Sequence, residues 1–163
     1  MRMTRTFLVL AVIGLSACTN SVENSAKDLV SAFADADRLK VESYIDMDQV
    51  TTEFGTAAMT QVQSTGNALM PGAREMMEAS ARETINTALN GMGTEEFAKN
   101  SAQLKDTEIR VVSEHDGVAI VEFILPPEAS APNGDPVVIK TRMRKEGKRW
   151  KIVEIGSLVD FLV

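Results

Sequence analysis

Tyr44, Asp46 and Asp48 form the one cluster in this sequence whose residue types and spacing suit acid–base chemistry. Burial in an apolar pocket raises the pKa of a carboxyl group, which can then exchange a proton near neutral pH. The same residues also suit a structural role, in which Asp46 caps a helix and Tyr44 packs in the core. We favour the structural role because spacing alone does not specify a pocket, and we assign no catalytic residue.

His115 is the only histidine and Cys18 the only cysteine, which excludes several kinds of site. A general base needs an orienting partner and a cleft, whereas His115 lies in a predicted turn between two strands. The chain has no further histidine or cysteine for a Ser-His-Asp or Cys-His arrangement, or for a Cys/His zinc site. Gly91-Met92-Gly93 lacks the spacing and the lysine of a phosphate-binding loop. We therefore expect no metal ion and no cofactor.

Methionine is concentrated in the predicted helices and gives a second candidate site. Its side chain is flexible and polarizable, so a cluster of methionines can line an adaptable groove for a lipid or a peptide. Ordinary core filling at helical spacing is the alternative, and it is the more frequent use of methionine. The residues that would line a groove for an apolar ligand are Met59, Met76 and Met77.

A basic segment lies near the end of a chain whose net charge is −6. Lys140, Arg142 and Arg144 share one parity of a predicted strand, so they lie on one face of a sheet. This face either contacts an anionic surface or an acidic partner, or is neutralised by acidic residues of the same chain; most charge runs are simply solvated. Within residues 140–151 only Glu146 opposes seven cations: Lys140, Arg142, Arg144, Lys145, Lys148, Arg149 and Lys151.

Hydrophobic periodicity predicts the helices that must position these side chains. Apolar residues recur at helical spacing over 22–34, from a cap at Asp46 to residue 62, and over 73–89. A short helix is expected around 39–45, and another runs from a cap at Thr94 to about residue 102.

The period changes from 3.6 to 2 after residue 106, which predicts four strands joined by short turns and one proline-rich loop. Helices followed by an antiparallel meander indicate an α+β fold, with N-terminal helices packed on a C-terminal four-stranded antiparallel sheet. The strands are expected from Thr107 to the turn at His115-Asp116-Gly117, over 118–125, over 137–145 and over 149–155. The expected core residues are Phe33, Phe54, Ile85, Val121, Phe123 and Trp150.

The first 18 residues have the order of features found in a secretion signal. Arg2 and Arg5 precede an apolar run, Phe7 to Leu15, which is shorter than the about 20 residues that span a bilayer. Leu15-Ser16-Ala17-Cys18 then resembles the lipobox of bacterial lipoproteins. The resemblance implies a cleaved signal peptide over 1–17, an acylated Cys18 with a short tether over 18–21, and one domain over 22–163.

The lipoprotein resemblance also implies where the protein is found. Attached acyl chains would anchor it to a membrane of the cell envelope without spanning that membrane, and it would face the periplasm. Thr19 follows the cysteine. In enterobacteria-like sorting an Asp at this place retains lipoproteins in the inner membrane, so the resemblance favours the outer membrane.

Two parts of the chain resemble a known fold. The stretch from Asp37 to Asp46 and the ending over 149–155 are similar to the first elements and the last strand of cone-shaped, nuclear transport factor-like folds. The layout of 22–160 is also similar to a bacterial cell-envelope domain of unknown function. Isomerases of the cone fold use Tyr and Asp around an apolar pocket, but this fold class hosts enzymes and inert modules alike.

Three functions stay open. The first is a non-catalytic envelope module that binds a partner protein or an anionic surface. The second is a carrier of a lipid or other apolar ligand in a pocket between helices and sheet, and the third is a small cone-fold enzyme. We favour the first, and a pocket would distinguish the second. The expected partners are the membrane, through the lipid, and an envelope protein or lipid ligand; the negative net charge argues against nucleic acid.

Overall fold

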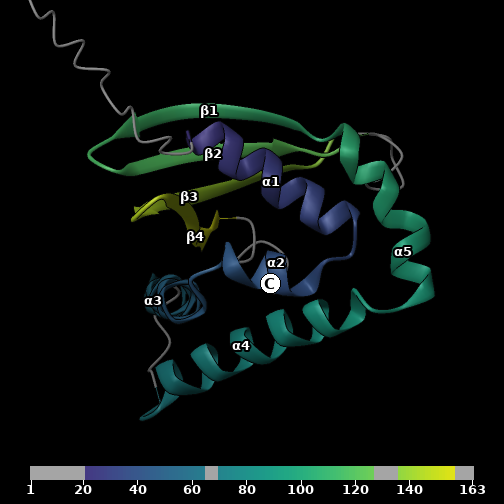
Figure 1. The fold of residues 1–163 in the computed structure, drawn as a ribbon. Helices are drawn as coiled ribbons and strands as arrows, with labels where there is room; N and C mark the ends of the chain where they lie inside the picture. Colours follow the sequence, from purple (N-terminus) through teal and green to yellow (C-terminus); the bar gives the residue numbers. More distant parts are fainter. Residues whose placement is uncertain (1–20, 65–69, 127–135, 157–163) are drawn as a thin grey trace, which may run out of the picture.

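The computed structural model describes residues 21–64, 70–126 and 136–156. Its first half is helical, as Figure 1 shows. The predicted leader, Cys18, most of the proline-rich loop and the apolar residues 158–163 lie outside the described residues. The helices are α1 (Val22–Ala34), α2 (Arg38–Ser43), α3 (Met47–Ser64), α4 (Ala73–Gly91) and α5 (Glu95–Ser101), and the 3-10 helix η1 (Ala102–Asp106) follows α5.

Four of these helices begin where a short polar side chain accepts a hydrogen bond from a backbone N–H three residues further on. Ser21, Asp37, Asp46 and Thr94 accept at 3.1, 3.1, 3.0 and 3.2 Å. The first N–H groups of a helix lack partners within the helix, so such caps fix where it starts. The predicted caps at Asp46 and Thr94 are therefore confirmed.

The sheet follows as an antiparallel meander in the order β1-β2-β3-β4, which confirms the predicted α+β fold. Asp116 and Gly117 connect the first two strands with φ values of 49° and 74°. Positive φ at both central residues matches the two-residue turns that suit the twist of a hairpin. The strands are β1 (Glu108–His115), β2 (Val118–Ile124), β3 (Val138–Glu146) and β4 (Arg149–Ile155).

The hydrophobic core lies between the helices and one face of the sheet, with α1 lying against that face (Figure 1). Ile85, Val121, Phe123 and Trp150 are buried in it, as predicted. The core also contains residues from α1, α2 and the start of α3, among them Leu29, Val41, Tyr44 and Val50.

Two of the predicted core phenylalanines are less buried than expected. Phe33 is partly buried and packs against the margin of the core. Phe54 is also only partly buried and does not belong to the core cluster. α3 packs against α4 and β4, and its fully buried residues are Val50, Thr51 and Gly55. Helical spacing predicted the helix correctly, but it predicted more buried residues on α3 than the structure has.

The link between α2 and α3 is hydrogen-bonded to the edge strand β4. Ile45 forms an isolated parallel bridge with Ile152. The N–H of Ile152 donates to the carbonyl of Tyr44 at 2.8 Å, and the N–H of Asp46 donates to the carbonyl of Ile152 at 2.9 Å. These bonds place the start of α3, and with it the side chain of Asp46, beside the last two strands.

Candidate functional site

Tyr44, Asp46 and Asp48, the candidate acid–base residues, are each held by a different partner. The buried Tyr44 hydroxyl donates to Asp28 Oδ2 at 3.2 Å. Asp46 caps α3 through Gln49. The Asp48 carboxylate is 88% exposed and pairs with Arg82 on α4 at 2.6 Å. The structural role that we favoured fits Asp46, which caps a helix, and Tyr44, which is buried in the core. None of these contacts brings two of the three side chains together.

Tyr44 has a shifted pKa without a catalytic setting. Burial raises the pKa of the Tyr44 phenol above its ordinary value of 10.0, and the negative charge of Asp28 raises it further. Arg149 lies over the ring, 5.9 Å from its centroid, and acts weakly in the opposite direction. Burial and the charge of Asp28 both favour the protonated hydroxyl, so Tyr44 serves as a hydrogen-bond donor within the fold.

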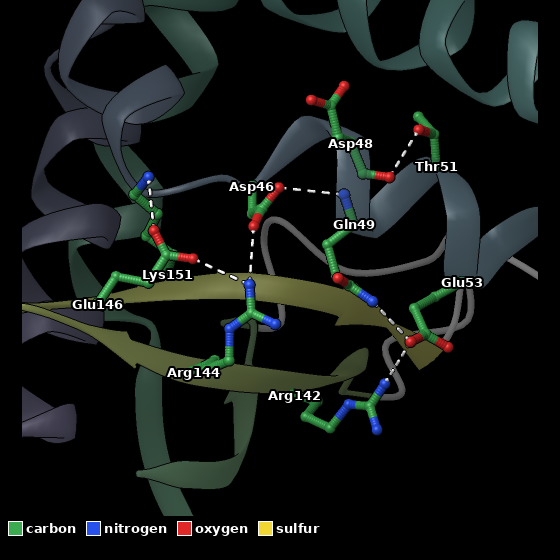
Figure 2. Close-up of polar contacts among 9 residues, drawn as sticks. All are labelled: Asp46, Asp48, Gln49, Thr51, Glu53, Arg142, Arg144, Glu146 and Lys151. Atoms are coloured by element: carbon green, nitrogen blue, oxygen red, sulfur yellow. Dashed lines mark hydrogen bonds and ion pairs between the residues drawn. The ribbon is translucent and has the colours of Figure 1, made fainter.

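Arg144 links the start of α3 to the last hairpin, as Figure 2 shows. Its Nη2 lies 3.1 Å from Asp46 Oδ2 and 3.0 Å from Glu146 Oε1. Lys151 reaches the other oxygen of Glu146 at 3.0 Å. Hydrogen bonds from Lys151 and then Arg144 hold the pKa of Glu146 below its usual range. Two cations of this hairpin, Arg144 and Lys151, therefore have acidic partners.

Arg142 is also paired within the chain. Its Nη2 lies 3.0 Å from Glu53 on α3 and 2.9 Å from Glu154 on β4 (Figure 2 shows the contact with Glu53). Lys140 is exposed and stands opposite Glu122 in the register of β2 and β3. The buried residues of β3 alternate with this row, which confirms the predicted parity. For Arg142 and Arg144 the contacts favour neutralisation by acidic residues of the same chain over contact with an outside surface.

His115 and the acidic residues offer no metal centre in the part of the chain that the structure describes. The His115 ring is 88% exposed at the end of β1 and lies 3.0 Å from Asp116. Within residues 21–64, 70–126 and 136–156, no group of three or more His, Cys, Asp or Glu side chains is arranged to hold a metal ion. No helix among these residues is long and apolar enough to cross a membrane.

An apolar pocket of about 270 Å³ lies between α1 and the sheet. Ten of its twelve lining residues are apolar. They come from α1, the link after α2, η1 and the last three strands together with the residues next to them. The lining consists of Leu29, Val30, Phe33, Ile45, Leu104, Thr107, Phe123, Leu125, Ile139, Thr141, Ile152 and Ile155.

The three methionines expected to line a groove do not line this pocket. Met76 is 72% exposed on α4, while Met59 and Met77 are partly buried on α3 and α4. This pocket lies on the α1 side of the sheet, and a groove lined by the three methionines stays a prediction. Periodicity identified the inward faces of α1 and of the strands, but it carries no information on whether side chains fill the space between them.

The two threonines in the pocket differ in their hydrogen bonds. The Thr141 hydroxyl donates to the carbonyl of Val121 at 3.2 Å. The Thr107 hydroxyl is shielded from solvent and has no hydrogen-bond partner among the described residues. A buried polar atom of this kind costs free energy unless something satisfies it. Because the Thr107 hydroxyl is shielded and the Thr141 hydroxyl is bonded to the main chain, the surface that the pocket offers to a ligand is apolar.

The chain matches no family model, no curated protein and no solved structure. Only the geometry of the pocket and the pattern of the sequence therefore bear on its function.

Proposed function

We propose that this protein is a non-catalytic, lipid-anchored cell-envelope module that carries a small apolar ligand in the pocket between α1 and the sheet. The observation that supports this most strongly is the lining, which is apolar at ten of twelve positions. Binding pockets for small molecules are typically apolar, with a few placed polar groups. Thr107 and Thr141 also line this pocket, but the Thr107 hydroxyl is shielded and the Thr141 hydroxyl donates to Val121, so the pocket suits an apolar ligand.

The pocket volume sets the size of the ligand. An engineered apolar cavity of about 150 Å³ binds benzene, and most small-molecule pockets hold about 300–1,000 Å³. The volume of this pocket, about 270 Å³, is larger than that of the engineered cavity and slightly smaller than that of most small-molecule pockets. It suits one short acyl chain or a single ring better than a whole phospholipid.

The carrier is supported better than the interaction module that the sequence favoured. That module would bind an anionic surface or an acidic partner through Lys140, Arg142 and Arg144. Arg142 and Arg144 each contact two carboxylates of the same chain, so outside contact would have to compete with these pairs. Binding of the domain to anionic vesicles, lost when all three cations are changed to Gln, would restore that alternative.

The membrane anchor is a proposal from the lipobox-like Leu15-Ser16-Ala17-Cys18. Acylated Cys18 would hold the domain at a membrane surface facing the periplasm, with the outer membrane favoured by Thr19. Two or three acyl chains give stable anchoring, whereas one chain binds only marginally. Metabolic labelling with a fatty acid should mark the wild-type protein and should not mark the Cys18→Ser variant. A wild-type protein that takes up no label would refute the anchor.

The carrier is tested with toluene and isoleucine methyl groups, using the full chain with Cys18→Ser purified without detergent. Ile45, Ile139, Ile152 and Ile155 line the pocket, whereas Ile85 does not. We expect toluene to shift the methyl resonances of the four lining residues and to leave that of Ile85 in place. Mass spectrometry of an organic extract of the purified protein would identify a natural ligand.

Neighbouring positions on β3 give a matched pair of variants. Ile139→Phe would fill part of the pocket, while Val138→Phe adds the same ring at a position that is 45% exposed and outside the lining. We expect the first to weaken toluene binding at least tenfold and the second to leave it unchanged. Equal binding of toluene by both variants would refute the carrier. Toluene binding that is seen only after residues 157–163 are deleted would also refute it, because the full chain would then not bind the ligand.

A further inference from the structure

The apolar pocket lies at one end of the sheet, where β2 and β4 end and β3 begins. Leu125 directly follows β2, Ile139 lies near the start of β3, and Ile155 is the last residue of β4. These three lining residues are only partly buried, as are Phe33 on α1 and Leu104 on η1. The lining therefore keeps apolar surface in contact with solvent, which is unfavourable unless something covers it.

The described part of the chain ends beside this pocket. Ile155 belongs to the lining, and Gly156 follows it as the last described residue. A Cβ added to Gly156 would lie 3.3 Å from the carbonyl oxygen of Lys140, so the chain here runs close to β3, next to the lining residue Ile139. An extended chain advances about 3.5 Å per residue, so residues three to six positions after Ile155 lie no farther than about 10–20 Å from it. These residues are therefore within reach of the pocket.

Residues 157–163 lie outside the described residues, and their sequence is apolar at five of seven positions. Asp160 carries the only charge in this segment. Removing Leu, Val and Phe side chains from water is favourable. A segment joined to the pocket by one or two residues is also present there at an effective concentration on the order of millimolar, which a second copy of the protein reaches only in concentrated solution. The segment consists of Ser157, Leu158, Val159, Asp160, Phe161, Leu162 and Val163.

We propose that residues 157–163 cover the apolar pocket of their own chain and compete with its ligand. The apolar side chains of the segment pack on the partly exposed lining, while Asp160 stays in water. A ligand binds when the segment moves away, so the affinity of the full chain is lowered by the fraction of time that the segment is in place. This inference rests on the proposed carrier function and adds to it a competitor within the same chain.

The position of the segment is tested with a spin label on Asp160→Cys, in the full chain that also carries Cys18→Ser. Broadening of isoleucine methyl resonances reports which side chains the label approaches. Ile45 lines the pocket from the link after α2. Ile124 is the last residue of β2 and lies on the opposite face of the sheet, because its neighbour Phe123 faces the core. We expect the label to broaden the resonance of Ile45 clearly more than that of Ile124.

The competition is tested by toluene binding, with Cys18→Ser in every variant. A chain that ends at Gly156 should bind toluene at least about threefold more tightly than the full chain, which corresponds to a segment in place at least about two thirds of the time. Phe161→Ser together with Leu162→Ser should also tighten binding, because it removes two apolar side chains and keeps the length of the segment.

The matched control is Val112→Ser together with Val138→Ser. It also removes two apolar side chains, but these valines are 51% and 45% exposed on β1 and β3 and do not line the pocket. We expect it to leave toluene binding unchanged. Equal tightening by the control and by the segment variant would show that the effect does not come from the segment, and would overturn the proposal.

The outcomes separate this inference from the proposed function. If the full chain and the chain ending at Gly156 bind toluene equally, the competitor is wrong and the carrier stands. If only the shortened chain binds toluene, the segment closes the pocket and the carrier is refuted. If neither chain binds, the carrier fails and the competition fails with it.

The spin label decides where the segment lies. Equal broadening of Ile45 and Ile124 would show that the segment lies elsewhere, and would overturn the proposal. Broadening of Ile45 when the label and the isotope are on different molecules would place the segment of a second copy in the pocket, and would overturn closure within one chain.

Discussion

The carboxylate of Asp46 joins two parts of the fold that are distant in sequence. One oxygen accepts the N–H of Gln49 at the start of α3, and the other lies 3.1 Å from Arg144 on β3. Asp46 is thus a helix cap and an ion-pair partner at once, which explains why a residue of catalytic type has a structural place here.

Asp46→Ala should lower the free energy of unfolding by about 1–3 kcal/mol, because it removes the cap and one partner of Arg144. Asp48→Ala is the matched control two residues further on. Its carboxylate is 88% exposed and pairs only with Arg82 among the described residues, so the loss should stay below about 1 kcal/mol. Urea denaturation measures both. Similar losses for the two variants would show that the cap and the Arg144 contact contribute little.

Tyr44 should make stability depend on pH in the alkaline range. Its pKa is raised in the folded state, so the stabilisation is complete below the unfolded value of about 10 and is lost as pH rises through the raised value. Tyr44→Phe should be less stable by about 0.5–1.5 kcal/mol at pH 7, having lost the bond to Asp28.

The test of this prediction is the difference in unfolding free energy between wild type and Tyr44→Phe from pH 7 to 11. The difference should narrow above pH 10, since only the wild type has this phenol to ionise. Lysines titrate in the same range in both proteins and cancel in the comparison. A difference that stays constant to pH 11 would mean that the hydroxyl is not shielded in solution.

Among the elements, α3 and α4 pack closely at Gly55. A Cβ added at Gly55 would lie 2.6 Å from Glu78 Cγ on α4, whereas a Cβ on Gly91 would meet no heavy atom within 4 Å. Glycine within a helix costs about 0.5–1 kcal/mol relative to alanine. The same substitution therefore has opposite consequences at the two positions.

Gly55→Ala should destabilise the protein, because the clash with Glu78 outweighs the gain in helix propensity. Gly91→Ala should be neutral or stabilising by up to about 1 kcal/mol. Adding Glu78→Ala to Gly55→Ala should restore stability, and the double-mutant cycle over these two sites measures the coupling. Stabilisation by Gly55→Ala alone would show that α4 moves aside at little cost.

Helices and strands were largely predictable from local patterns, because caps, turns and periodicity act within a few residues. Asp46 and Thr94 were recognised as caps, and the parity of Lys140, Arg142 and Arg144 gave the correct face of β3. The partners of that face were not predictable. Glu53 and Asp46 meet the arginines only because the whole chain brings α3 against β4.

The whole molecule depends on one core shared by helices and sheet. Phe123 is 7% exposed within this core, and Phe54 is partly exposed outside it. Phe123→Ala should cost about 3–5 kcal/mol of unfolding free energy, the usual range for a buried Phe. Phe54→Ala should cost about 1 kcal/mol, near the average for single substitutions. Chemical denaturation compares them directly, and equal costs would mean that Phe54 packs more tightly than described.

The candidate site was less predictable than the core, because it depends on how the whole chain packs and not on local patterns. Residue type singled out Met59, Met76 and Met77, but the pocket lies among Leu, Ile, Val and Phe side chains that look like ordinary core positions in the sequence. Whether such a gap stays open depends on how side chains from distant elements pack together, which no local pattern records.

The bridge between Ile45 and Ile152 has a consequence for the order of folding. During synthesis the helices can form early, since their caps are local, but the α2–α3 link gains its sheet partner only when β4 has emerged. The contact between Asp46 and Arg144, which lie 98 positions apart, likewise forms only after β3 has been synthesised. Contacts between residues this far apart in sequence generally slow folding. The contacts that tie the α2–α3 link to the sheet can therefore form only after the last strand has been synthesised.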